Sequence, residues 1–97
     1  MDDLKKIISI YSITKKMSTR ALYLLEDHKD LRSDIILLLC QYVTVLGAVK
    51  GGIEHMYENM DDGKLYLALY LMTKESVTQA AYIERDLFER GIILEDQ

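Results

Sequence analysis

Residues 33–60 read SDIILLLCQYVTVLGAVKGGIEHMYENM and hold the strongest pattern in the chain. Apolar side chains recur there at alternating steps of four and three residues, the spacing of a helix that buries one continuous seam. The seam keeps its phase across Gly51 and Gly52, which a loop would have no reason to do. We therefore expect one continuous helix, although each internal glycine costs about 1 kcal/mol relative to alanine. The seam consists of Ile35, Leu39, Tyr42, Leu46, Val49, Ile53, Met56 and Met60.

The segments on either side of this helix predict two more helices of similar length, over residues 3–27 and 64–90. Both repeat apolar side chains with a helical period, and the chain contains no proline. A turn is expected before the third helix, with Gly63 in the left-handed conformation. Gly91 is expected to end that helix, and the apolar tail at 92–94 to fold back on the bundle. The main apolar seam of the third helix is expected along Leu65, Leu69, Met72, Ser76, Ile83 and Leu87.

Length and composition indicate one small globular domain over residues 1–97. Of these, 49% are hydrophobic and 29% are charged, with a formal net charge of -4, which is too apolar for a disordered acidic chain. Three helices of about 40 Å joined by short turns predict an all-α fold: three long antiparallel helices in an up-down-up bundle. The few amide side chains, one asparagine and three glutamines, are typical of a heat-adapted source.

The sequence favours a cytoplasmic protein. The acidic start does not resemble a secretory signal, and a single cysteine, Cys40, fits a reducing compartment and excludes an intrachain disulfide. The apolar run at 35–49 covers 15 residues, which is about 22 Å of helix against a bilayer core of about 30 Å. We interpret this run as a buried bundle helix, with a short membrane-inserted segment as the alternative.

The chain has more apolar surface than three helices can bury among themselves. Residues 35–40 and 65–72 are apolar almost all round, and such a helix is normally buried on every side. A monomer would expose this surface as a large patch, so we expect a homodimer or higher homo-oligomer, the helices joining into a larger bundle. A different protein partner is the alternative occupant of the same surface.

Two pairs of residues are the expected association surface. Tyr66 and Tyr70 are chosen because tyrosine is favoured where one end of the ring is buried and the other is wet. Gly47 and Gly51 are four residues apart, a spacing that lets two helix backbones approach closely. The same small-residue face could instead pack against the first or third helix of its own chain, and the sequence leaves both arrangements open.

No arrangement of side chains indicates an enzyme, a cofactor or a metal site. His28 and His55 are the only histidines, and the seam phase turns His55, Glu54 and Glu58 away from the core. The Glu-x-x-His pairs of di-metal bundles do not occur. Cys40 lies in an apolar run without a histidine within three turns, so we expect a buried structural thiol and no catalytic residues. A binder of a metal or a small molecule in the bundle core is a further alternative.

Basic residues are concentrated in the first helix, where five of them and no acid occur between positions 4 and 25. Lys5, Lys16 and Arg20 could contact phosphates, which makes a nucleic-acid-binding regulator the alternative function. Nucleic acid is an unfavoured partner, because five charges on an acidic protein bind weakly and lose affinity with salt. The main interpretation is a small non-catalytic protein that acts through protein–protein association, as an adaptor, regulator or assembly subunit. The same cations could equally pair with acidic residues of the third helix, namely Glu75, Glu84, Asp86 and Glu89.

Overall fold

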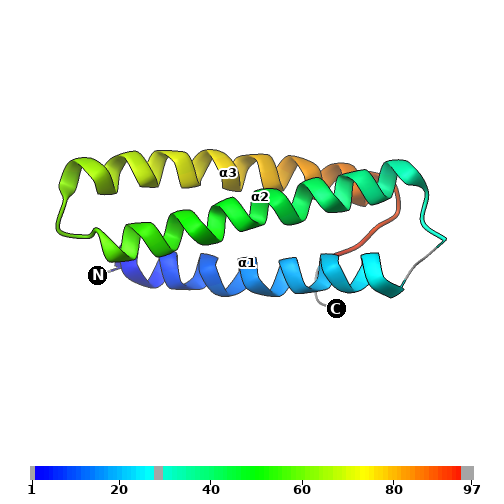
Figure 1. The fold of residues 1–97 in the computed structure, drawn as a ribbon, viewed down its shortest axis with the longest axis horizontal. Coiled ribbons are helices and arrows are strands. Elements are labelled where there is room, and N and C mark those ends of the chain that lie inside the picture. Colours follow the sequence, from blue (N-terminus) through cyan, green and yellow to red (C-terminus); the bar gives the residue numbers. More distant parts are fainter. Residues whose placement is uncertain (1, 28–29, 95–97) are drawn as a thin grey trace.

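The computed structural model describes residues 2–27 and 30–94, and within these ranges it contains three α-helices and no strands (Figure 1). The helices are α1 (Asp2–Asp27), α2 (Ser33–Glu58) and α3 (Gly63–Glu89). The expected all-α class is confirmed, and each helix begins and ends within two residues of its expected bounds. α2 continues without interruption through both of its central glycines.

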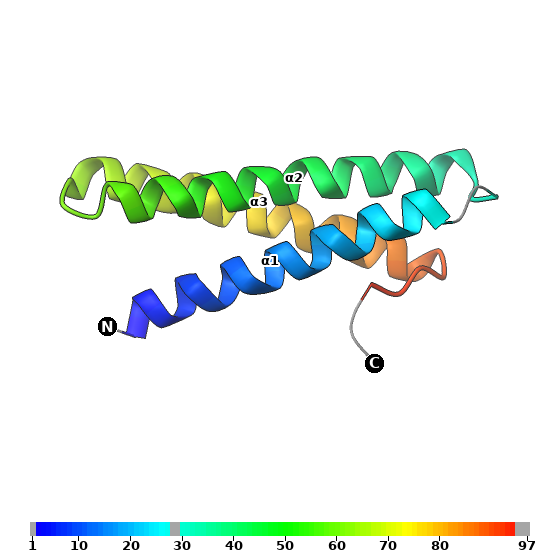
Figure 2. The ribbon, with the colours of Figure 1, turned by 60° about the horizontal axis from the view of Figure 1, so that its bottom comes forward.

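α2 is the central helix. It packs against α1 and against α3, whereas no described Cα atom of α1 lies within 8 Å of one in α3. Figure 2 shows α1 diverging from the other two helices toward its N-terminal end. The α2 seam is buried from Ile35 to Met56, and only Met60 is exposed, because it lies in the turn beyond the end of the helix.

α2 and α3 approach most closely at Gly52. A Cβ atom at this position would lie 2.2 Å from Thr73 Oγ1 and 3.3 Å from Thr73 Cβ, so a side chain fits here only if Thr73 moves. The Thr73 hydroxyl oxygen is buried and has no hydrogen-bond partner in the structure. Gly52 is thus used for close packing within the chain.

The buried line of α3 differs from the expected one. The seam was expected to include Leu65 and Met72, yet the buried residues are Thr73, Ala80 and Leu87, and Met72 is 67% exposed. The helix is rotated about its axis because the small side chains of Thr73 and Ala80 allow the close contact with α2. Leu65 and Met72 are therefore left outside the core, whereas Leu87 is buried as expected and Ile83 packs against the core.

The start of α3 is set by a side-chain cap. Asp62 precedes the helix, and its carboxylate accepts a hydrogen bond of 3.1 Å from the backbone N–H of Leu65. Gly63 is already helical, and Gly91 is the one described residue with a positive φ. The expected left-handed conformation at Gly63 is wrong, because the Asp62 cap starts the helix directly at the glycine.

Gly91 ends α3 as expected, and the tail folds back. The N–H of Gly91 donates to the Phe88 carbonyl at 3.0 Å, and the N–H of Ile92 donates to the Leu87 carbonyl at 2.9 Å, which together form a Schellman cap. The Leu94 side chain is buried in the core, and Arg20 Nη1 donates to the Leu94 carbonyl oxygen at 2.7 Å. The tail thereby ties α1 to the end of α3.

A set of ion pairs joins the start of α2 to the end of α3. Arg32 donates to both carboxylate oxygens of Asp34, at 3.1 and 2.9 Å. Arg90 contacts the same carboxylate, and the Nε of Arg90 donates to Asp86 at 3.0 Å. The hydrogen bonds from Arg32 hold the pKa of Asp34 below its ordinary value, because they stabilise the charged form. The carboxyl of Asp86 in turn raises the pKa of Arg90.

The outer face of α2, opposite α1 and α3, is exposed and includes the small residues Cys40, Thr44, Gly47 and Ala48. Cys40 lies on this face, so the expectation of a buried thiol is wrong. The error arose because the run at 35–40 is buried on one side only, and Leu37 remains 60% exposed. By length and composition alone, α2 is also the one helix in the described ranges that could cross a membrane.

Candidate association surface

Because the described Cα atoms of α1 and α3 stay more than 8 Å apart, the facing sides of the two helices form the walls of a groove, which we call the α1–α3 groove. Ile10 and Ile13 line it from α1, and Tyr70 and Val77 line it from α3. These four side chains are between 37% and 57% exposed, although all of them are apolar or aromatic. The floor is the α2 seam, namely Tyr42, Leu46, Val49, Ile53 and Met56.

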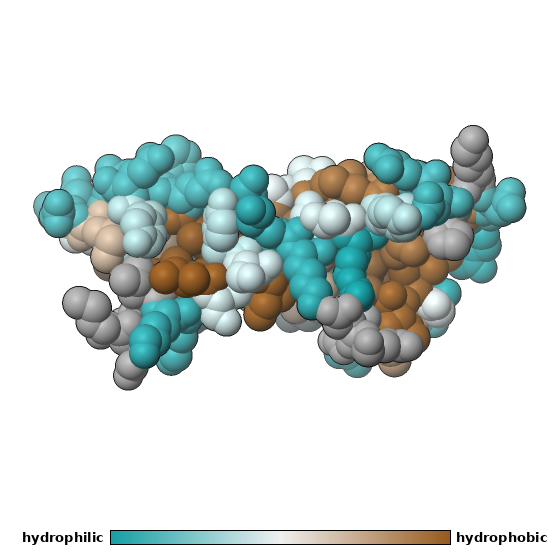
Figure 3. Space-filling model, turned by 90° about the horizontal axis from the view of Figure 1, so that it is seen from below, coloured by the Kyte–Doolittle hydropathy of each residue, from teal (hydrophilic) through white to brown (hydrophobic). Residues whose placement is uncertain are grey.

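The groove contains two adjoining hollows of about 150 and 210 Å³. An apolar hollow of about 150 Å³ is large enough for a benzene-sized group. Figure 3 views the molecule from the α1 side and shows apolar side chains reaching the surface in patches that polar side chains separate. At the far end of the bundle the tail at 92–94 lies between the same two helices, with α3 residues on one side and Arg20 and Leu24 of α1 on the other. The protein's own apolar tail therefore already occupies one end of the space between α1 and α3.

Basic side chains border the α1–α3 groove. Lys74 lines it from α3, Arg85 lies beside its tail-filled end, and Lys6 lies one helical turn before Ile10 on α1. Glu84 is the acidic residue among the described lining residues, and its Oε2 accepts a hydrogen bond of 3.2 Å from a tyrosine hydroxyl of the floor. Lys74 and Lys6 thus place positive charge at the end of the groove away from the tail, whereas Arg85 pairs with Glu89 at 3.4 Å.

The expected association residues lie on two different surfaces. Tyr70 lines the groove, and Tyr66 lies half-buried one turn earlier in α3. Gly47 and Gly51 lie on the outer face of α2, where a Cβ atom at either position would have nothing within 4 Å. Contacts within the chain therefore do not explain these two glycines, and the structure does not bring them together with the two tyrosines.

The basic stripe expected on α1 is partly used inside the fold. Lys5 and Lys16 are exposed, whereas Arg20 is half-buried and holds the tail through the Leu94 carbonyl. The acids proposed as its partners interact elsewhere: Glu89 pairs with an arginine one turn earlier in α3, and Asp86 with an arginine one turn later. In both pairs the two residues are four apart in sequence, a spacing that brings opposite charges together on neighbouring helical turns.

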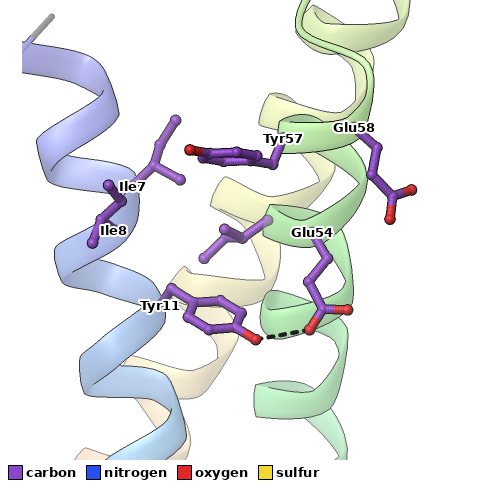
Figure 4. Close-up of a pocket in the computed structure, with 7 residues that line it drawn as sticks. Ile7, Ile8, Tyr11, Glu54, Tyr57 and Glu58 are labelled. Atoms are coloured by element: carbon purple, nitrogen blue, oxygen red, sulfur yellow. Dashed lines mark hydrogen bonds between the residues drawn. The ribbon is translucent and has the colours of Figure 1, made fainter.

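A further hollow of about 370 Å³ lies between the N-terminal half of α1 and the C-terminal half of α2 (Figure 4). Ile7, Tyr11 and Tyr57 line it, and the Tyr11 hydroxyl donates to Glu54 Oε1 at 2.9 Å. This hydrogen bond raises the pKa of Tyr11, because the carboxylate favours the protonated phenol. Glu58 points away from the hollow in Figure 4.

His55 Nδ1 lies 3.7 Å from Glu58 Oε2, and both side chains are exposed on the polar side of α2. Over residues 2–27 and 30–94, no group of three or more His, Cys, Asp or Glu side chains is arranged to hold a metal ion. The hollows in these ranges are walled mainly by apolar side chains, which suits them to receive apolar side chains of another helix. Comparison of the chain with protein-family models, with curated proteins and with solved structures finds no match.

Proposed function

We propose that this is a non-catalytic helical protein that acts through protein–protein association, and that its first partner is another copy of itself. The observation that supports this is the α1–α3 groove, in which Ile10, Ile13, Tyr70 and Val77 remain about half exposed. Monomeric proteins rarely expose large contiguous apolar patches. A fourth helix laid between α1 and α3 would bury these side chains and complete a four-helix arrangement around the α2 seam.

The energetics of the groove require a partner with apolar residues of its own. Fully burying a large apolar side chain contributes about 1.5–3 kcal/mol, so four side chains that are already half-buried contribute about 4 kcal/mol together. Association costs roughly 4–15 kcal/mol of lost translational and rotational freedom. The groove alone therefore does not support a stable complex, and the surface that docks there must itself gain from burial.

The proposal includes a cytoplasmic location and no cofactor. The location is supported by α2, whose apolar seam packs against α1 and α3 instead of requiring lipid. The nucleic-acid alternative has less support, because one of the three residues proposed to contact phosphates, Arg20, donates a hydrogen bond to the tail. A gel shift at low salt with the Lys5→Glu and Lys16→Glu variants tests that alternative directly.

Light scattering coupled to size-exclusion chromatography tests the main proposal over a concentration series. Near micromolar concentration, we expect the measured mass of the wild type to exceed that of one chain. We expect the Tyr70→Asp variant to have the mass of one chain. Leu22→Asp is the matched control, because Leu22 is also 45% exposed but lies on α1 outside the lining of the groove. A wild type that stays at the mass of one chain at every concentration would refute self-association. Equal effects of the two variants would show that the groove is not the surface through which the copies associate.

A further inference from the structure

α3 carries a second exposed apolar surface, on the side that faces away from α2. Leu71, Met72 and Tyr82 are 56%, 67% and 68% exposed, which makes them among the most exposed large apolar side chains described. Glu75 and Glu89 fall on the same face at helical spacing and are also exposed. We call these five residues the α3 ridge, which combines apolar side chains with negative charge.

The α3 ridge and the α1–α3 groove are complementary in charge. Lys74 lines the groove and Lys6 lies one turn from its lining residue Ile10, whereas the ridge carries Glu75 and also Glu89, which already pairs with Arg85 at 3.4 Å. Groove against groove, or ridge against ridge, would bring like charges together, which costs affinity and suppresses that pairing. Ridge against groove places opposite charges at the border of an apolar contact.

We propose that the α3 ridge of one copy docks in the α1–α3 groove of a second copy. This inference rests on the proposed self-association and names the two surfaces that meet. It accounts for both sets of exposed apolar side chains with one contact, because Tyr70 and Val77 of the groove meet Leu71, Met72 and Tyr82 of the ridge.

The two surfaces also match in length. The described groove lining on α3 runs from Tyr70 to Glu84, which is about 21 Å at about 1.5 Å per residue. The ridge runs from Leu71 to Glu89, or about 27 Å on the same scale. One ridge can therefore cover the groove, entering from the end that the tail at 92–94 does not fill.

Such a contact is heterologous, because the two copies use different surfaces. Each copy retains a free ridge at one side and a free groove at the other, so the assembly grows into a ring or a filament. A two-fold dimer, in which both copies use the same patch, behaves differently when the two surfaces are blocked in separate variants. That difference provides the test.

The experiment uses two full-length variants, each with one surface blocked. Tyr70→Asp blocks the groove and keeps the ridge, and Tyr82→Lys blocks the ridge and keeps the groove. We expect each variant alone to have the mass of one chain by light scattering, with unchanged helicity by circular dichroism. An equimolar mixture should give a complex of two chains, because one intact ridge meets one intact groove and neither copy can add a third.

A charge reversal placed in one copy at a time sharpens the result. Lys74→Glu should weaken the mixed pair about fivefold when it is added to the Tyr82→Lys copy, which supplies the groove. Added to the Tyr70→Asp copy, which supplies the ridge, the same substitution should leave the dissociation constant unchanged. Equal effects in both copies would place Lys74 outside the contact and overturn the proposed docking.

The outcomes separate this inference from the proposed function. A wild type that assembles while the mixture remains at the mass of one chain would refute the ridge-in-groove contact and leave self-association standing. The same conclusion follows if Tyr82→Lys alone assembles like the wild type. A wild type that has the mass of one chain at every concentration would refute both.

Discussion

The substitution Gly52→Ala tests how α2 and α3 pack. In an open helical position, replacing glycine by alanine stabilises a helix by about 1 kcal/mol. At Gly52 the new Cβ would lie 2.2 Å from Thr73 Oγ1, 3.3 Å from Thr73 Cβ and 3.6 Å from Thr73 Cγ2. Rotating the threonine side chain moves Oγ1 but not Thr73 Cβ, which stays 3.3 Å from the new atom, closer than most contacts of a real Cβ. Overpacking of this kind costs about 1–3 kcal/mol, so we expect a net change between zero and about 2 kcal/mol of destabilisation.

Gly47→Ala and Gly51→Ala are the matched controls, since a Cβ at either position meets nothing within 4 Å. Each should stabilise the protein by about 1 kcal/mol, or about 4–8 °C in melting temperature for a domain of this size. Urea denaturation followed by circular dichroism, at one fixed protein concentration, measures all three variants. Thr73→Ala combined with Gly52→Ala should recover at least about 1 kcal/mol relative to additivity. If Gly52→Ala stabilises as much as its two neighbours, the close approach of the helices is refuted.

Three further predictions concern the end of the bundle where the tail lies. Leu94→Ala should lower the free energy of unfolding by about 2–4 kcal/mol, because it empties a buried position that Arg20 helps to hold; thermal melting measures this, and an unchanged midpoint would contradict the buried tail. Gly91→Ala should cost about 1–2 kcal/mol, because φ is +90° there and an L side chain is strained in that region; Gly47→Ala serves as its control. The Asp34 carboxyl has a lowered pKa in the folded protein, so its contribution to stability is present above its ordinary value of 3.8 and is lost as the pH falls through the folded value. Asp34→Asn should therefore lower the urea midpoint at pH 7 and have little effect near pH 2, and an equal effect at both values would exclude the charge of Asp34 as the cause.

The sequence was sufficient for the helices, for the buried face of α2 and for the cap at Gly91. These features depend on local periodicity and on the conformational freedom of one glycine, both of which can be read without tertiary contacts. The rotation of α3 could not be read in the same way. The buried line of α3 shares only Leu87 with the expected apolar seam, because its other two members, Thr73 and Ala80, are small and give a weak hydrophobic signal. The deciding contact is Thr73 against Gly52, a pair that sequence hydrophobicity gives no reason to match.

The candidate surface was predictable only in part. A surplus of apolar residues in α3 was evident, and Tyr70 does line the groove. The groove itself follows from the separation of α1 and α3, which depends on the angle between helices and is not encoded in the pattern of any single helix. For the same reason Cys40 was expected inside and lies outside: the run at 35–40 faces two neighbours that both lie on the same side of α2.

The one-sided attachment of α1 has a consequence for how the protein opens. The last turns of α1 are held by α2 and by the tail through Arg20, whereas its first turns diverge from the other two helices (Figure 2). Elements with few buried contacts open at lower free energy than the core. Amide protons near Ile8 should therefore exchange with solvent through local openings, while those of α2 exchange only on global unfolding. The N-terminal half of α1 would then detach as a unit, widening the groove while the α2–α3 hairpin remains folded.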